Sequence, residues 1–166
     1  MKTKIVILLC VSFLFIALAY SAEEKEYMSP NGAYIAVVVS VPGSEESKVV
    51  VKTKNGRTIC SKSYASEDGT HGLVVQKAAW TPDSRFFVYS MSSSGGHKPW
   101  HFPADFCSIH HSITRSLDNY VGPITVSDLE IKAPDIVKGK STRKDIDDQV
   151  DFEVRLSSLE MYGKKK

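Results

Sequence analysis

The hydrophobic residues of this 166-residue chain fall in short runs of the kind that form β-strands, and near the end, at 150–156, they follow the two-residue period. Short β-branched or aromatic runs alternate with turn residues, and stretches with the helical period are scarce. The run AYIAVVVSV at 33–41 is apolar apart from Ser40 and predicts a strand buried on both faces. Further strands are predicted at 48–53, 57–64, 73–80, 85–92, 105–111, 113–117 and 150–156. The pattern therefore predicts an all-β protein.

One turn-and-strand phrase occurs twice, as SPNGAYIAVVV at 29–39 and WTPDSRFFVYS at 80–90. In each copy a proline presets φ for a tight turn, and the following Asn or Asp can bond to nearby backbone. Asn55-Gly56 lies between two further strand-like runs and predicts a hairpin with a type I′ turn. The repetition predicts one supersecondary unit used twice, each unit a four-stranded meander.

The phrase AAWTPDSRFFVYS resembles the Trp-Ser-Pro-Asp-Gly phrase of TolB-type β-propeller repeats, and SPNGAYIAVVV is similar to a weaker second copy. The resemblance covers about residues 25–117. It implies blades of four antiparallel strands, which in that family serve mostly as binding or scaffolding surfaces. Propellers close with about four to eight blades, and this chain has material for two.

The expected architecture is therefore two blade-like antiparallel sheets stacked face to face, and not a closed propeller. The units span about 25–66 and 72–119, within one domain at 22–166. Additional strands between about 122 and 160 are expected to cover or extend one edge.

Residues 1–21 have the three-part form of a secretory signal peptide: a basic start, an apolar run and small residues before EEKEY. The apolar run is short of the ~20 residues that a membrane-spanning helix needs. Ala19 and Ser21 suit cleavage after Ser21, and Ala17 and Ala19 suit cleavage after Ala19. We expect a periplasmic or secreted protein that leaves the membrane after cleavage.

Removal of Lys2 and Lys4 with the signal peptide leaves 19 basic residues against 19 acidic ones. Nucleic-acid binders normally carry a basic stripe, whereas the only basic run here is at 164–166. Nucleic acid is therefore not an expected partner. Cleavage also removes Cys10, which leaves Cys60 and Cys107 in a compartment that permits disulfides. The sequence leaves two alternatives open, a bridge or two buried thiols.

The segment 92–111 contains four of the five histidines, His97, His101, His110 and His111. Histidine binds zinc and copper, so these four are weak metal candidates. Pro99 and Pro103 exclude a regular helix that would stack the first two. The neighbouring histidines of the second pair point to opposite faces of a strand. We expect Trp100 and Phe102 in the same segment to cover a core edge and to lie near a contact surface.

Other candidate chemistry has little support. Asp145, Asp147, Asp148 and Asp151 form an acidic group, but Val150 and Leu156 stand where a calcium loop starting at Asp145 needs glycine and glutamate. Ser94 precedes two glycines and His97, yet no acid or oxyanion donor is placed around it. A Gly-x-Ser-x-Gly motif, a phosphate loop and a dinucleotide fingerprint are all missing from the sequence. The sequence predicts no catalytic residue and no cofactor.

These observations predict an exported, non-enzymatic protein-interaction or scaffolding module. Its partner would be another protein or a second copy, bound through a sheet face or a sheet edge. The alternative is a small metal-binding protein or metal-dependent enzyme that uses the loop between His97 and His111.

Overall fold

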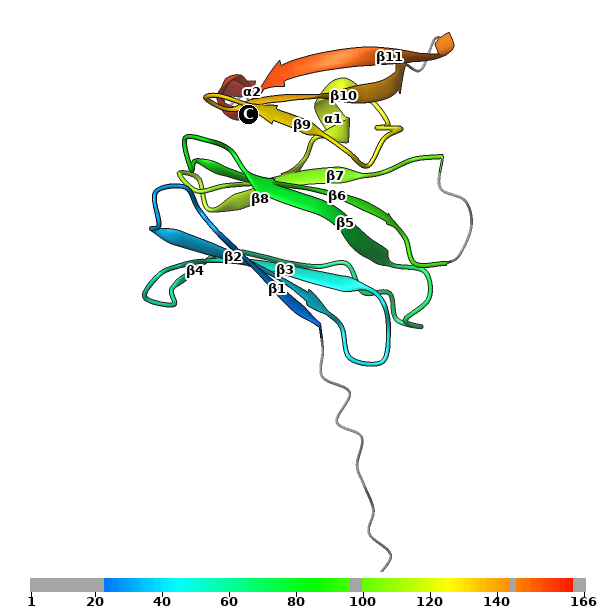
Figure 1. Ribbon diagram of the computed structural model, residues 1–166. Coiled ribbons are helices and arrows are strands. Elements are labelled where there is room, and N and C mark those ends of the chain that lie inside the picture. Colours follow the sequence, from blue (N-terminus) through cyan, green and yellow to red (C-terminus); the bar gives the residue numbers. More distant parts are fainter. Residues whose placement is uncertain (1–22, 96–99, 144–145, 163–166) are drawn as a thin grey trace, which may run out of the picture.

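The structure, a computed structural model, describes residues 23–95, 100–143 and 146–162. The predicted signal peptide, His97 and Asp145 lie outside these residues. Three antiparallel sheets lie on top of one another as layers (Figure 1). The all-β fold predicted from the sequence is confirmed, and the three sheets do not close into a ring.

The first sheet is a meander of four strands in sequence order: β1 (Glu24–Met28), β2 (Tyr34–Ser40), β3 (Ser47–Thr53) and β4 (Thr58–Ser63). The Asn55-Gly56 hairpin forms between β3 and β4, but its turn is not the expected type I′. Gly56 has φ of 90°, whereas Asn55 is not in the left-handed region. The hydrogen bond from Thr53 N to Arg57 O, 2.9 Å, closes a three-residue loop instead.

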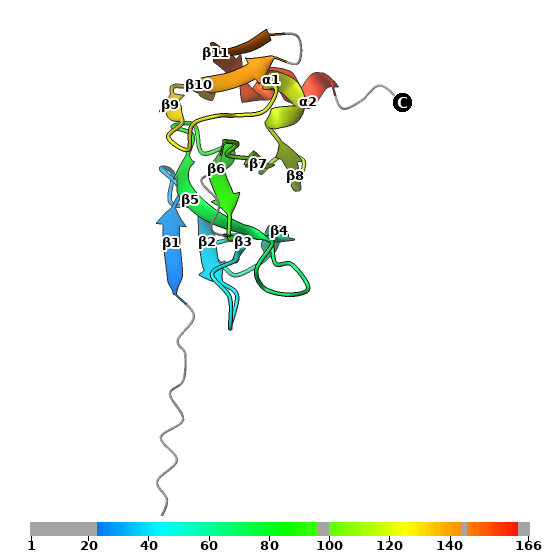
Figure 2. The same cartoon turned by 90° about the vertical axis from the view of Figure 1, so that its right-hand side faces the viewer.

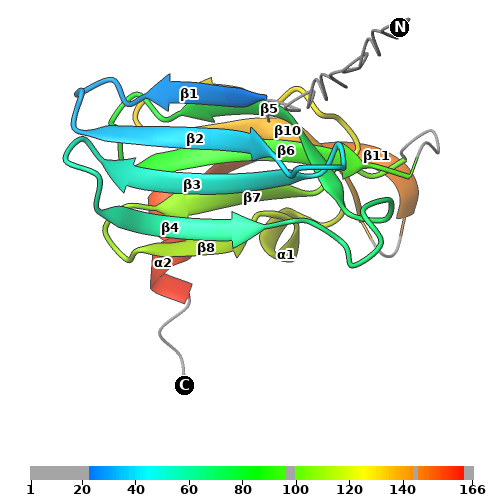
Figure 3. The same ribbon diagram turned by 90° about the horizontal axis from the view of Figure 1, so that it is seen from below.

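The second sheet repeats this order with β5 (Leu73–Trp80), β6 (Phe86–Ser93), β7 (Ala104–Ser108) and β8 (Ile113–Ser116). Seen from below, β1 to β4 lie over β5 to β8 in the same order (Figure 3). The strand predicted at 105–111 ends earlier, at Ser108, because the chain then turns into β8 with Ser112 at φ of 52°. The prediction of two stacked four-stranded sheets is confirmed.

The two copies of the repeated phrase contact each other where the sheets stack. Gly32 and Ser84 occupy equivalent turn positions and both have positive φ, 69° and 61°. The Ser84 hydroxyl accepts a hydrogen bond from Asn31 N at 3.0 Å. The indole N–H of Trp80 donates to Tyr27 O at 2.8 Å. The repeated turns therefore tie one sheet to the next.

The C-terminal part forms a third layer and not the edge extension that we expected. It comprises α1 (Asp118–Val121), β9 (Glu130–Lys132), β10 (Ile136–Arg143), β11 (Ile146–Arg155) and α2 (Leu156–Tyr162). The three strands make a sheet in the order β11-β10-β9, which lies over the free face of the second sheet (Figures 1 and 2). Within the described ranges, no helix has the length and apolar composition needed to cross a bilayer.

Two hydrophobic cores separate the three layers, and β6 supplies both. Phe87, Tyr89 and Met91 belong to the core against the first sheet, whereas Phe86 and Val88 belong to the core against the third. Successive side chains of a strand point to opposite faces, so the middle sheet is buried on both. Each outer sheet keeps one face toward solvent.

The strand at 33–41 is consequently not buried on both faces as predicted. Ala36 and Val38 reach the first core, whereas Val37 points outward with Ile35 and Val39. The latter two are only half-buried. Both faces of this strand carry apolar side chains, although one face is the outer surface of the three-layer stack.

Candidate functional site

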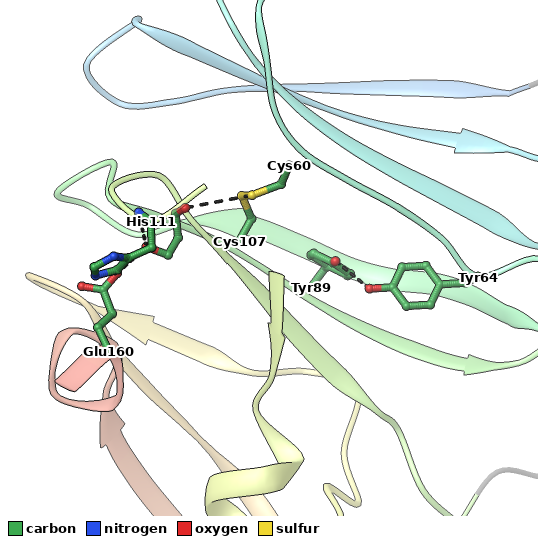
Figure 4. Close-up of a disulfide and its surroundings, with 7 residues drawn as sticks. Cys60, Tyr64, Tyr89, Cys107, His111 and Glu160 are labelled. Atoms are coloured by element: carbon green, nitrogen blue, oxygen red, sulfur yellow. Dashed lines mark hydrogen bonds and ion pairs between the residues drawn. A yellow bond between two sulfur atoms is a disulfide. The ribbon is translucent and has the colours of Figure 1, made fainter. Parts of the chain in front are cut away.

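A disulfide joins Cys60 of β4 to Cys107 of β7, across the core between the first two sheets (Figure 4). The sequence left this pairing open. Both residues are buried, and the bridge closes a separation of 47 residues. The bond is therefore a cross-link between two layers, and burial keeps it away from soluble thiols.

Ser108, His111 and Glu160 lie together beside this disulfide, with Ser108 O 4.0 Å from Cys60 Sγ (Figure 4 labels His111, Glu160 and the two cysteines). Glu160 of α2 accepts a hydrogen bond from the Ser108 hydroxyl, and its carboxylate lies 3.7 Å from His111 Nε2 and 3.3 Å from Arg85 Nη2. The Ser108 hydroxyl thus donates to the carboxylate and not to the imidazole, and Ser108 is fully buried. A nucleophile needs the opposite arrangement, with its proton directed to a base and its oxygen accessible. The group instead anchors α2 to the turn between β7 and β8.

A second polar group closes one side of the first core. The Tyr64 hydroxyl donates to Asp105 and lies 2.6 Å from the Tyr89 hydroxyl, while Lys62 Nζ is 2.6 Å from Asp105 Oδ2. Burial, together with the nearby Asp105 charge, raises the pKa of both tyrosines well above their ordinary value. Both hydroxyls therefore stay protonated at neutral pH and serve as donors. Asp105 lies on β7, and its partners Lys62 and Tyr64 lie on β4 and directly after it, so this group links the first sheet to the second.

The buried carboxylate of Glu46 holds the connection between the first and second sheets. It accepts hydrogen bonds from Ser66 N at 2.8 Å, Ser66 Oγ at 2.6 Å, Gly72 N at 2.5 Å and Ser94 Oγ at 3.0 Å. The Ser66 hydroxyl contributes most to lowering the pKa of Glu46, against the opposing effect of burial. Ser94, considered above as a nucleophile, is therefore one of the donors that fix this carboxylate.

Of the three described histidines of the predicted metal loop, His101 lies apart from the other two. The rings of His110 and His111 are 4.6 Å apart, because both residues lie in the turn after β7 and not on opposite faces of a strand as expected. His101 precedes β7 and pairs with Asp118 at 2.5 Å, whereas His110 and His111 follow β7. The strand alone separates them by roughly 13 Å at about 3.3 Å per residue. Among the described residues, no three His, Cys, Asp or Glu side chains are grouped as a metal site would need. Of the acidic group near the last strand, Asp148 and Asp151 are exposed, and Asp151 pairs with Lys140 at 3.7 Å.

Trp100 does not cover a core edge as expected, because it is 71% exposed. Its ring lies 5.2 Å from that of His101. Phe102 is half-buried, and its N–H donates to Ile124 O at 2.8 Å. Trp100 therefore stays accessible, as a contact residue requires, whereas Phe102 is held against the chain that leads into the third sheet.

The two ends of the stack carry different surfaces. On the third sheet, six of the side chains that face solvent are charged and paired with one another: Lys132 with Glu130 at 3.0 Å, Lys138 with Glu153, and Lys140 with Asp151 at 3.7 Å. The uncharged Ile136, Thr142 and Gln149 lie on the same face. The Lys138 ammonium also holds the pKa of Glu153 below its ordinary value. This end is a hydrated, ion-paired surface.

The outer face of the first sheet has an apolar centre instead. We define this outer face as the side chains of β1 to β4 that point away from the second sheet. The strand register places them in three rows: Glu24–Val39–Lys48–Ser63, Glu26–Val37–Val50–Ser61 and Met28–Ile35–Lys52–Thr58. Val37 is 4% exposed and Met28 is 54% exposed. Four β-branched residues, Ile35, Val37, Val39 and Val50, thus form a continuous strip, and the ion pair between Glu26 and Lys52 at 3.8 Å lies across it.

Sequence reasoning missed this surface because it did not recognise β1 as a strand. The segment EKEYM is rich in charge, yet its alternation places Tyr27 in the core and both glutamates outside. The alternation of Lys48, Val50 and Lys52 with Val49 and Val51 gave the same signal in β3. Neither the protein-family models nor the curated proteins compared with this chain gave a match.

Proposed function

We propose that this protein is an exported, non-enzymatic interaction module that binds a protein through the outer face of the first sheet. The observation that carries the proposal is the difference between the two ends of the stack. One end carries three cross-strand or neighbouring ion pairs, whereas the other carries a single pair, Glu26–Lys52, and leaves Ile35, Val39 and Val50 half-buried in one strip. An apolar strip with a polar rim is typical of a protein contact surface.

The sheet edges favour a face over an edge as the binding surface. The free strand β1 has three charged residues among five, and β5 carries Lys77 at a register shift. At the opposite edges of these first two sheets, β4 carries Lys62 and β8 is only four residues long. Charges, bulges and short edge strands are the usual means by which proteins prevent edge pairing.

Export is part of the proposal and is supported by the leader pattern of residues 1–21 and by the disulfide, which is typical of oxidising compartments. The resemblance to TolB-type repeats, whose blades serve as binding surfaces, points to the same class of function. Mass spectrometry of the exported protein should find its first residue between Tyr20 and Glu23; an intact Met1 would contradict cleavage.

Site-specific photo-crosslinking in producing cells tests the surface. A photoreactive residue at Val39, on the outer face, should give a discrete adduct that mass spectrometry identifies, whereas one at Lys140, on the third sheet, should not. Val50→Asp should remove the adduct because it places a charge in the strip, and Ser63→Asp, at the margin of the same face, should leave it. Equal adducts from both positions, or an adduct insensitive to Val50→Asp, would overturn the proposal.

A further inference from the structure

The charges on the outer face are separated by strand. The acidic residues Glu24 and Glu26 lie on β1, the basic residues Lys48 and Lys52 lie on β3, and β2 between them is apolar. The face is therefore neutral as a whole but divided into an acidic side and a basic side.

This division makes the face complementary to itself in charge at the row of Glu24 and Lys48. A two-fold axis along β2, between two copies, turns one sheet over so that β1 of each copy lies against β3 of the other. Glu24 then faces Lys48 of the second copy, and the reciprocal pair forms by symmetry. From this register we infer that the outer face binds a second copy of this chain, a step that rests on the function proposed above.

The apolar positions fit the same arrangement. Ile35 and Val39 lie on β2 and are half-buried, so each meets its own counterpart near the axis. Met28, the most exposed apolar side chain of the face, lies against Lys52 of the second copy. The aliphatic stem of a lysine can cover an apolar side chain while its ammonium remains in water. In the middle row the same axis places Glu26 against Val50 of the second copy, so the 58% exposed Glu26 carboxylate has to turn toward solvent in the dimer.

Two of the four charges have no competing partner within the chain. Among the described residues, Glu24 and Lys48 form no ion pair, whereas Lys52 lies 3.8 Å from Glu26 across the apolar strip. The latter side chains are 32% and 58% exposed, so both can turn outward. The unpaired charges thus stand at the two positions that the axis brings together.

Stacking of the outer face on the third sheet of another copy is disfavoured. That contact would bury the paired charges of Lys132, Lys138 and Lys140 against an apolar strip, and desolvation of charge is costly. It would also leave one free end on every added copy, which leads to open chains of molecules. The two-fold contact closes after two copies.

The size of the surface sets the expected strength. Three strands at about 4.8 Å spacing and about 20 Å length cover only a few hundred Å² per copy. Specific interfaces bury about 1,200–2,000 Å² in total, so the dimer should be weak and reversible, with a dissociation constant of roughly 10–100 μM.

Sedimentation velocity of the exported, processed protein over a micromolar concentration series tests the inference. The wild type should show a monomer–dimer equilibrium. Lys48→Glu should raise the dissociation constant about tenfold, because it places two acids opposite each other. The double variant Glu24→Lys/Lys48→Glu should restore the affinity to within about threefold, since the pair is only exchanged. The matched control Lys77→Glu makes the same charge change on the second sheet and should have no effect.

A wild type that remains monomeric at high micromolar concentration would overturn the inference. So would equal effects of Lys48→Glu and Lys77→Glu, or failure of the double variant to recover. The proposed function is judged separately, by the adduct from Val39. A different protein in that adduct, with a monomeric purified chain, would leave the proposed function standing and refute self-association.

Discussion

Replacement of Trp80 tests the packing between the first two sheets. The side chain is 8% exposed, and its ring centroid lies 5.2 Å from that of Phe87 and 6.1 Å from that of Tyr34. Trp80→Ala removes these contacts and leaves a cavity, so it should lower the free energy of unfolding by about 3–5 kcal/mol. Because domains have only about 5–15 kcal/mol of stability, much of the fold's margin would be lost.

A second variant separates the ring from its hydrogen bond. Trp80→Phe keeps an aromatic ring against Phe87 but loses the donor to Tyr27 O, and it should cost about 1–2 kcal/mol. The exposed residue Arg57 provides the control: Arg57→Ala should change stability by less than about 0.5 kcal/mol.

Urea unfolding under non-reducing conditions gives the three values. Far-UV circular dichroism is the suitable signal, because after replacement of Trp80 the only tryptophan left is Trp100, which is already exposed. Equal losses in Trp80→Ala and Arg57→Ala would show that this ring does not hold the two sheets together. A loss in Trp80→Phe as large as in Trp80→Ala would show that ring packing contributes nothing.

Three further outcomes are expected. Joint replacement of Cys60 and Cys107 by alanine should lower the free energy of unfolding by about 4 kcal/mol, from the chain entropy of a loop of this length; a urea midpoint equal to that of the oxidised wild type would contradict a structural bridge. The pKa of Glu46 is lowered in the folded protein from its ordinary value of 4.5. The ionised side chain therefore stabilises the fold at pH values above 4.5, and this stabilisation is lost as the pH falls through the pKa of the folded state. Thermal unfolding of Glu46→Gln should therefore show a deficit at pH 7 that shrinks toward pH 3; a deficit independent of pH would refute the role of the charge. Gly139→Ala should cost about 1–3 kcal/mol, because its Cβ would lie 2.7 Å from Leu129 Cδ2 and 2.9 Å from the Phe152 ring; Phe152→Leu relieves the second contact and should recover part of the loss in a double-mutant cycle.

Local sequence signals were sufficient for most of the first two sheets. The two Pro-Asn and Pro-Asp phrases mark the turns before β2 and β6, and both turns form as the residues predict. Such signals act within a few residues, so no distant partner is needed to interpret them. The prediction of a type I′ turn at Asn55-Gly56 was wrong. The turn type depends on the twist of the neighbouring strands and on the loop length as well as on the dipeptide.

The candidate surface could be predicted only in part. The alternation in β3 shows that Lys48 and Lys52 share a face with Val50. It does not show that Glu24 lies on the same face, because that depends on the register of β1 against β2. A register shift of one residue would move every side chain to the other face.

The sequence by itself determined the strand period, the repeated unit and the order of strands within the first two sheets. Tertiary structure alone decided that the C-terminal strands cover the second sheet and leave the outer face of the first sheet free. It also decided that Cys60 and Cys107 form a disulfide, since the strands around each cysteine have the same sequence pattern whether the two thiols are bonded or free. The physical reason is that a strand's own residues fix which side chains share a face, whereas burial of that face depends on which distant layer packs against it.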